Sequence, residues 1–119
     1  MSKIFGFNYW LRYGFDKYSE YIILSKVNQQ YWINFASENN INKVEITEKI
    51  DEICNRFEKM SIQEWNMRYF DAPMEFFPNF EWRLNIHTDT VNVLCGGLDN
   101  YPHNWKMFID ILNFMGVNL

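Results

Sequence analysis

The residues that could carry acid–base or nucleophilic chemistry are few and lie far apart in the sequence. There are two histidines, His87 and His103, and two cysteines, Cys54 and Cys95. Cys95 and His103 are close enough to suggest a Cys–His pair or half of a metal site. A structural zinc, however, needs four ligands with recognisable spacing, and a nucleophilic cysteine needs an activating environment. Neither pattern is present, so we expect surface or helix-capping histidines and reduced, buried thiols.

Carboxylates and glycines offer no clearer catalytic pattern. Asp51 and Glu52 fall on the polar side of a predicted helix, whereas Asp71 and Glu75 lie in an irregular segment, where Asp71 could act as an acid or base in a cleft. Loop carboxylates that cap a turn or line an interface explain this second pair better. Gly96-Gly97 lacks the lysine and serine or threonine of a phosphate-binding loop. The sequence therefore predicts neither an enzyme nor a cofactor or metal site, and a hydrolase built on Asp71 and a histidine is left as the third hypothesis.

Residues 69–80 form the segment that most favours a binding function. Its two prolines, Pro73 and Pro78, exclude regular helix and central strand alike, and the segment is unusually apolar for a loop. Protein interfaces concentrate their binding energy in a few aromatic anchors surrounded by polar groups. The predicted partner-binding residues are Asp71, Met74, Glu75, Phe76, Phe77 and Phe80. In the competing interpretation, these phenylalanines fold inward as a plug over the end of the sheet.

The composition indicates one globular domain, residues 1–119, with an excess of aromatic side chains. Hydrophobic residues make up 48% and charged residues 22%, which argues against intrinsic disorder. Aromatic residues reach 19%, more than so small a core can easily bury, so we expect aromatic surface of the kind that marks interfaces. The net charge of −4 opposes nonspecific nucleic-acid binding. No long apolar run or signal-peptide pattern is present, so we expect a cytoplasmic protein without a membrane span.

Hydrophobic periodicity predicts the secondary structure. Apolar–polar alternation indicates strands at residues 3–13 (with a bulge at Gly6), 20–27, 31–36, 82–86 and 91–95, the last two forming a hairpin that Gly96-Gly97 ends. Residues 37–43 read as a loop, and residues 61–64 read as a helical capping box that leads into a short strand near residues 65–69. Helical spacing predicts helices over residues 44–60 and from about Pro102 to Met115, with Gly116 as the left-handed cap.

The order of these elements predicts the fold class. It is β-β-β-α-β-β-β-α, and a half-buried sheet and an amphipathic helix must each cover the other's apolar face. We therefore expect an α+β fold, with a single mainly antiparallel sheet of five to six strands and two helices packed on one face.

Two strings resemble those of a family of small bacterial and phage proteins, most of them uncharacterised. They are the W-x-L-x-I strand at residues 82–86 and GGLDNYPHNW at residues 96–105. In that family an amphipathic helix leads to a W…Y segment, matched here by Trp65 and Tyr69, and a G-x-N-x-Y-P-x-N-W string opens the last helix. The resemblance covers about residues 46–115. The chain departs from it at Phe80-Glu81, where the family often has Asp-Gly, and at Leu98-Asp99. The resemblance implies the fold and supplies no catalytic residues.

These features favour a non-enzymatic protein-binding protein of bacterial or phage origin that occludes a surface of its partner. A small acidic protein can present carboxylates to the basic groove of a nucleic-acid enzyme. An inhibitor of a defence nuclease (an anti-CRISPR-like role) and an immunity protein against a toxin both fit this description. The alternative is a single-stranded nucleic-acid or nucleotide binder that stacks bases on N-terminal aromatic residues, although few cations flank them. Those residues are Phe5, Phe7, Tyr9, Trp10 and Tyr13. Excess aromatic surface also allows a homodimer.

Overall fold

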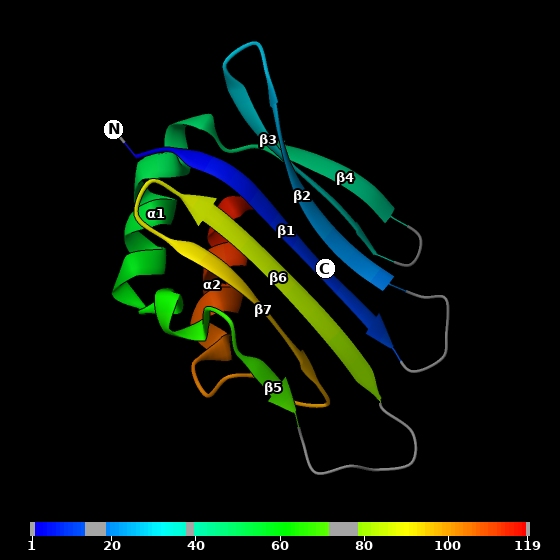
Figure 1. Ribbon diagram of the computed structural model, residues 1–119. Coiled ribbons are helices and arrows are strands. Elements are labelled where there is room, and N and C mark those ends of the chain that lie inside the picture. Colours follow the sequence, from blue (N-terminus) through cyan, green and yellow to red (C-terminus); the bar gives the residue numbers. More distant parts are fainter. Residues whose placement is uncertain (1, 14–18, 38–39, 72–78, 119) are drawn as a thin grey trace.

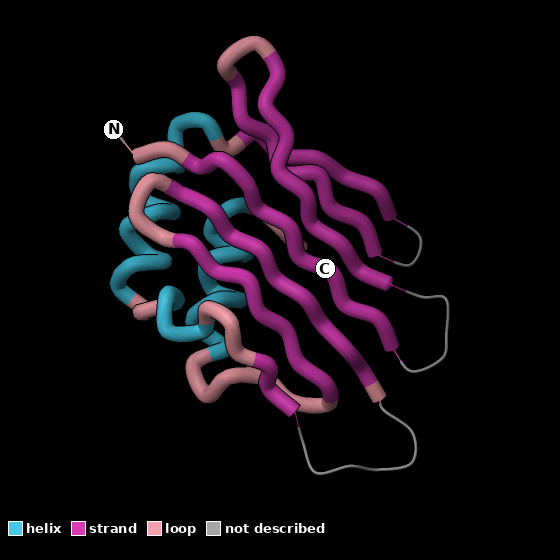
Figure 2. The backbone as a smooth tube through the Cα atoms, viewed as in Figure 1, coloured by secondary structure: helices cyan, strands magenta, loops and turns pink. Residues whose placement is uncertain are grey.

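The computed structural model describes residues 2–13, 19–37, 40–71 and 79–118, and in this part the chain is an α+β protein with two layers. One layer is a twisted sheet, and the other contains both helices, which lie on the same face of the sheet (Figures 1 and 2). The strands are β1 (Ile4–Tyr13), β2 (Ser19–Val27), β3 (Gln30–Ser37), β4 (Asn40–Glu45), β5 (Tyr69–Asp71), β6 (Phe80–Thr88) and β7 (Asn92–Leu98). The helices are α1 (Ile50–Lys59) and α2 (Trp105–Met115), with short 3₁₀ helices η1 (Thr47–Lys49) and η2 (Ile62–Trp65) on either side of α1.

The strand order in the sheet is β4-β3-β2-β1-β6-β7-β5. Every neighbouring pair is antiparallel except β5 and β7, which run parallel. The predicted α+β class, mainly antiparallel sheet and two helices are confirmed. The prediction of five to six strands is wrong, because the described residues form a mixed sheet of seven. Strand β4 was expected to be part of a loop; it is an edge strand exposed along most of its length, so its sequence lacks the alternation that one buried face imposes.

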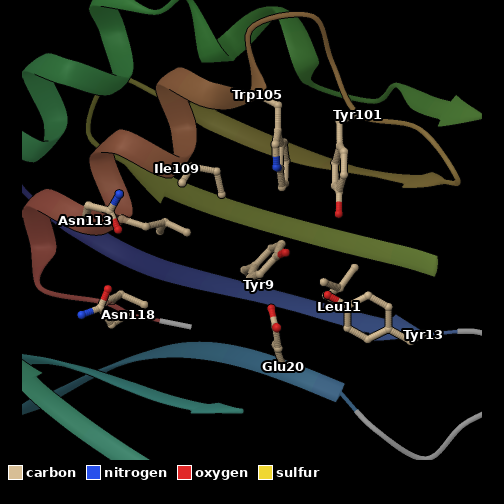
Figure 3. A pocket seen from close by; sticks show the side chains of 11 residues that line it. Tyr9, Leu11, Tyr13, Glu20, Tyr101, Trp105, Ile109, Asn113 and Asn118 are labelled. Carbon is tan, nitrogen blue, oxygen red and sulfur yellow. The ribbon is translucent and has the colours of Figure 1, made fainter. Parts of the chain in front are cut away.

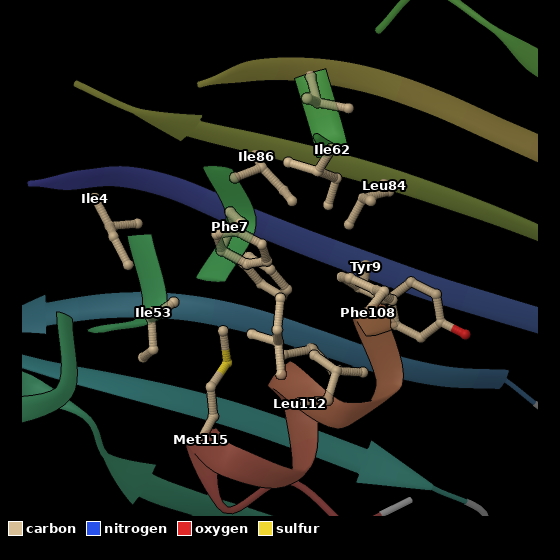
Figure 4. Packing of buried hydrophobic residues seen from close by; sticks show 14 of the residues in the cluster. Ile4, Phe7, Tyr9, Ile53, Ile62, Leu84, Ile86, Phe108, Leu112 and Met115 are labelled. Carbon is tan, nitrogen blue, oxygen red and sulfur yellow. The ribbon is translucent and has the colours of Figure 1, made fainter. Parts of the chain in front are cut away.

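Alternation along the central strands directs one set of side chains toward the helices, where they form the core (Figure 4). The ring of Phe7 on β1 lies between the two helices, with its centroid 6.1 Å from that of Phe57 on α1 and 6.3 Å from that of Phe108 on α2. Other buried members of this core are Ile4, Tyr9, Ile22, Ile33, Ile53, Leu84, Ile86, Leu112 and Met115. Both helices therefore pack on the centre of the sheet, and none of the described residues forms a helix on the opposite face.

An aromatic cluster joins η2, β6 and α2 at one end of this core. The ring centroids of Trp82 and Trp105 are 4.7 Å apart, and those of Trp65 and Trp105 are 5.8 Å apart. Both buried indoles keep a hydrogen-bond partner, as buried polar groups must. Nε1 of Trp82 donates to the carbonyl oxygen of Asn100 at 2.8 Å, and Nε1 of Trp65 donates to Oδ1 of Asn104 at 3.0 Å.

The glycine pair at the end of the hairpin corrects a sequence prediction. Gly96 and Gly97 were expected to end the second strand, but β7 continues through both of them to Leu98. Both glycines are buried, and a Cβ on Gly97 would meet the indole of Trp82 and, at 2.7 Å, the carbonyl oxygen of Phe70. These glycines therefore allow the close approach of strand β5 and of the Trp82 ring, rather than a turn.

The helix prediction was correct in kind and wrong at one boundary. The first helix was expected from residue 44, but Val44 belongs to β4, where it pairs with Ile33 of β3, and α1 begins only at Ile50. Ser61 adopts a left-handed conformation and its side chain makes no cap hydrogen bond, so the predicted capping box is wrong; η2 nevertheless leads to the short strand β5. At the end of α2, Gly116 is the predicted left-handed cap, with φ of 98°.

Asn104 directly precedes α2, at the position of a helix cap. Its side chain makes no cap hydrogen bond, because it is used elsewhere. Oδ1 accepts from Trp65, and Nδ2 donates to the carbonyl oxygen of Met60 at 3.0 Å. It thereby ties the start of α2 to the end of α1. Among the described residues, no helix is long and apolar enough to cross a membrane.

Candidate functional site

Two of the six predicted partner-binding residues lie in the part of the chain that the structure describes. Asp71 ends β5 and is exposed. Phe80 begins β6, is half-buried, and stacks on Tyr101 with ring centroids 4.7 Å apart. The other four residues, Met74, Glu75, Phe76 and Phe77, lie outside the described residues. The choice between interface and plug therefore remains a prediction for them.

Asp71 and His87, two of the titratable residues that suggested chemistry, lie far apart. Asp71 of β5 pairs with Leu98 of β7, which in turn pairs with Glu81 near one end of β6. His87 lies near the other end of β6, where it pairs with Asn92. The rise of a strand puts about 20 Å between these two positions. Within the described residues, no group of three or more His, Cys, Asp or Glu side chains could hold a metal ion.

The two cysteines are free and buried, as the sequence predicted. Burial raises the pKa of the Cys95 thiol to about 12. Burial, with nearby carboxylates including Asp89, raises the pKa of the Cys54 thiol to about 11. A thiol in this environment is protonated at neutral pH and therefore is a poor nucleophile and a poor metal ligand.

The face of the sheet without helices is the largest candidate site, and we call it the uncovered face (Figure 1). Register and alternation place side chains from all seven strands on it. Its apolar and aromatic side chains are Phe5, Trp10, Tyr21, Ile23, Val27, Trp32, Ile41, Tyr69 and Leu94. Several of these are well exposed, including Phe5 at 60%, Leu94 at 57% and Ile23 at 46%. Exposed aromatic surface, which the composition predicted, is therefore present and gathered largely on one face.

The centre of the uncovered face is a hollow of about 380 Å³. Trp10, Tyr21 and Ile23 line one side of it, and Arg83 and Leu94 line the other. At its floor, Asn8 and Asn85 are direct neighbours on β1 and β6. The hollow thus combines apolar walls with two side-chain amides that can donate and accept hydrogen bonds, which is the combination that binding sites use for affinity and orientation.

Charge on the uncovered face is balanced. Glu81 contacts both neighbouring arginines, at 3.4 Å from Arg12 and 3.3 Å from Arg83, and it accepts a hydrogen bond from the Tyr69 hydroxyl at 3.2 Å. Three cations face three carboxylates here by register: Arg12, Lys43 and Arg83 against Glu45, Asp71 and Glu81. The net charge of −4 is therefore not concentrated on this face.

Cations lie over several of the exposed rings. Arg83 lies 5.0 Å from the ring centroid of Tyr69, Lys43 lies 5.0 Å from that of Trp32, and Arg12 lies 5.9 Å from that of Trp10. Contacts of this kind stabilise exposed rings by about 0.5–1 kcal/mol each. They hold the ring and the cation in place before any ligand binds, which lowers the conformational entropy lost on binding.

The aromatic residues of the first strand do not form one platform. The bulge after Ile4 places Phe5 on the uncovered face and regular alternation places Trp10 there, while Phe7 and Tyr9 are buried under the helices. Trp32, Tyr69 and Leu94 lie on the uncovered face but were not among the predicted partner-binding residues, although Tyr69 begins the segment 69–80 that the sequence favoured. Alternation did indicate that Trp32 faces away from its strand neighbours, but alternation alone does not say which of two faces is covered.

Comparison of the chain with protein-family models, with curated proteins and with solved structures finds no match.

Proposed function

We propose that this chain is a non-enzymatic binding protein that recognises another protein through the uncovered face of its sheet. The observation that carries this proposal is the gathering of the partly exposed rings of Trp10 and Tyr21 and the exposed side chains of Ile23, Arg83 and Leu94 around one hollow. Tryptophan, tyrosine and arginine dominate the energetic centres of protein interfaces. Trp10 and Arg83 belong to the hollow itself, and Trp32 and Tyr69 extend the same face on either side.

A protein partner is favoured over nucleic acid by the charges. Affinity for nucleic acid comes mainly from lysine and arginine side chains that neutralise phosphates. On the uncovered face, Arg12 and Arg83 are both engaged with Glu81, and cations and carboxylates are equal in number. A balanced, aromatic face instead suits a protein surface with its own mixed charges and apolar anchors.

The finer proposal is that the partner is a nucleic-acid enzyme, and that the chain is a bacterial or phage inhibitor of a defence nuclease or an immunity-type protein. The support for it is the acidic composition, with a net charge of −4, which speeds encounter with a basic partner through long-range attraction. Asp71, at the rim of the uncovered face, would then meet a cation of the partner.

Oxidative footprinting with the partner captured from source cells tests this proposal. Binding to the uncovered face should protect Trp10 and Trp32 from hydroxyl-radical oxidation by several-fold, because both rings become buried in the complex. Met107, which is 48% exposed on α2, should be oxidised equally in the free and bound protein. Protection of Met107 without protection of the two tryptophans would locate the interface on the helical layer and contradict the proposal.

The second candidate function, single-stranded nucleic-acid binding, is favoured by one observation. Trp10, Trp32 and Tyr69 each present a ring with a cation over it on an open sheet, an arrangement that can stack bases and contact phosphates. If this function is correct, a mixed-sequence oligonucleotide should quench tryptophan fluorescence at low salt, and its affinity should fall steeply as salt increases. Absence of quenching at low ionic strength would exclude it.

A further inference from the structure

The two edges of the sheet differ in how far they are open to a further strand (Figure 1). One edge is β5, which pairs with β7 over only three residues. The other edge is β4, which has six residues and is exposed along most of its length. Among the described residues, none pairs with the outer side of β4. Very short edge strands rarely act as templates for pairing, so β4 is the edge that could accept another strand.

The backbone groups at this edge follow from the ladder between β3 and β4. The amide of Ile46 donates to the carbonyl oxygen of Tyr31 at 2.8 Å, in the position that continues this ladder. In an antiparallel pair, residues bonded to the neighbouring strand alternate with residues whose N–H and C=O point away from it. The even-numbered residues of β4 therefore bond to β3, and the N–H and C=O groups of Ile41, Lys43 and Glu45 point outward.

Side chains on both faces of the sheet hold β4 in place. Val44 points to the covered side and packs against the core beside Gly116. Lys43 lies on the uncovered face, with its Nζ 5.0 Å from the ring centroid of Trp32 on β3. The edge is therefore already formed in the single chain, and a second strand would not first have to order it.

The charges of this edge complement themselves. Lys43 and Glu45 lie two residues apart on the uncovered face. A second copy related by a two-fold axis perpendicular to the sheet places its β4 antiparallel to the first, and every residue keeps its face. When that axis passes beside Val44, Lys43 of each copy lies opposite Glu45 of the other. Opposite charges directly across two strands stabilise their pairing, whereas like charges destabilise it.

The neighbouring registers lack this complementarity. An axis beside Lys43 places the two lysines opposite each other. An axis beside Asn42 places Lys43 opposite Ile41 and gives the lysine no carboxylate. A lysine on an edge strand ordinarily prevents pairing. Of these three registers, only the one centred on Val44 gives each lysine a carboxylate.

We propose that the chain forms a two-fold dimer by antiparallel pairing of β4 with β4 of a second copy, with Lys43 opposite Glu45 in both directions. The two sheets then become one continuous sheet, and both uncovered faces lie on the same side of it. The interface is small, so the dimer is weak, with a dissociation constant of about 0.1 mM. Its formation needs no other partner, so the purified chain alone tests it, and its failure leaves the proposed function untouched.

Sedimentation velocity at concentrations from about 10 µM to about 1 mM measures this dimer, because its population depends on concentration. A salt concentration of about 0.15 M screens the repulsion between two chains of net charge −4. Lys43→Glu and Glu45→Lys should each weaken dimerisation about tenfold or more, because each creates two pairs of like charges. An equimolar mixture of the two variants should dimerise as the original chain does, and so should the double variant, because every pair regains opposite charges.

Lys106→Glu and Glu58→Lys are the matched controls. They change the net charge by the same amounts, at exposed positions of α2 and α1. Both should dimerise as the original chain does, so a loss confined to the β4 variants is not an effect of net charge. A chain that stays monomeric at about 1 mM, or a dimer that Lys43→Glu and Glu45→Lys leave unchanged, would overturn the proposal.

Amide hydrogen exchange locates the pairing without any change of charge. In the single chain the outward amides of Lys43 and Glu45 should exchange rapidly, whereas the amide of Val44 is protected by its bond to β3. At about 1 mM, exchange at Lys43 and Glu45 should become several-fold slower. Slower exchange on other elements, with these two amides unchanged, would place the contact elsewhere and contradict the proposal.

Discussion

Replacing Gly97 with alanine should lower the free energy of unfolding by about 3 kcal/mol, the largest effect expected for so small a change in this chain. The new Cβ would fall against the indole nitrogen of Trp82 and within 2.7 Å of the carbonyl oxygens of Phe70 and Asn100. Two of these three atoms belong to the backbone, which cannot rotate away. The substitution would also displace the Trp82 indole from its 2.8 Å hydrogen bond to Asn100 and leave a buried donor unpaired.

Gly6→Ala is the matched control for this experiment. Gly6 lies in the bulge of β1, and a Cβ there would meet no atom within 4 Å. Its φ is outside the positive range, so alanine fits the backbone, and we expect a change within about 0.5 kcal/mol. Urea titration followed by tryptophan fluorescence measures both variants. Equal stability of the Gly97→Ala and Gly6→Ala proteins would show that the backbone of β5 moves away from β7 without cost.

These two glycines also show how far the sequence could specify the sheet. The bulge at Gly6 was predicted, because the alternation over residues 3–13 is imperfect, as in a strand that a glycine interrupts. The role of Gly97 was not, because a glycine that lets another strand approach has the same sequence signature as one that ends a strand. The partner that decides between them, β5, lies far from Gly97 in the sequence and is only three residues long.

The prediction of where the first helix begins was wrong for a related reason. Residues 44–60 carry a helical apolar period, yet Val44 and Glu45 pair with Ile33 and Trp32 in β3. A polar edge strand leaves no alternating pattern, so its presence could not be read from the sequence. The pairing with β3 then outweighed a local preference for helix that is worth only a few tenths of a kcal/mol per residue.

The sequence predicted which types of side chain would be exposed, but not where on the fold they would lie. The excess of aromatic residues indicated exposed rings, and the structure has them. Their position on the uncovered face depends on which side of the sheet the helices cover, which alternation leaves open. A cavity of about 260 Å³ beside α2 (Figure 3) also depends on long-range register: Glu20 lines it beside Leu11 of another strand, and Tyr101 and Trp105 come from the far end of the chain. The alternation of Tyr9, Leu11 and Tyr13 was the only local signal for it.

Replacing Leu94 with glutamate should weaken binding of the protein partner about 100-fold, if the uncovered face is the interface. Leu94 is 57% exposed at the edge of the central hollow, so in the free protein a glutamate side chain would extend into water. Its strand position is held through its own backbone: Asn66 Oδ1 accepts from the Leu94 amide at 2.9 Å, and the Met67 amide donates to the Leu94 carbonyl oxygen at 2.8 Å. We therefore expect stability to change by less than about 1 kcal/mol. In the complex the same carboxylate would be buried without a partner, at a cost of about 2–5 kcal/mol.

Met107→Glu and Asp71→Ala make this test decisive. Met107 is exposed to a similar extent, 48%, but lies on α2, so its replacement introduces the same charge on the opposite layer and should leave affinity unchanged. Asp71 lies at the rim of the uncovered face and belongs to the predicted segment 69–80, so its truncation should weaken binding only a few-fold. Calorimetry with the purified partner ranks the three variants. A greater loss from Asp71→Ala than from Leu94→Glu would move the centre of the interface into that segment. A greater loss from Met107→Glu would move it to the helices, because only groups that become dehydrated in the complex respond this strongly to an added charge.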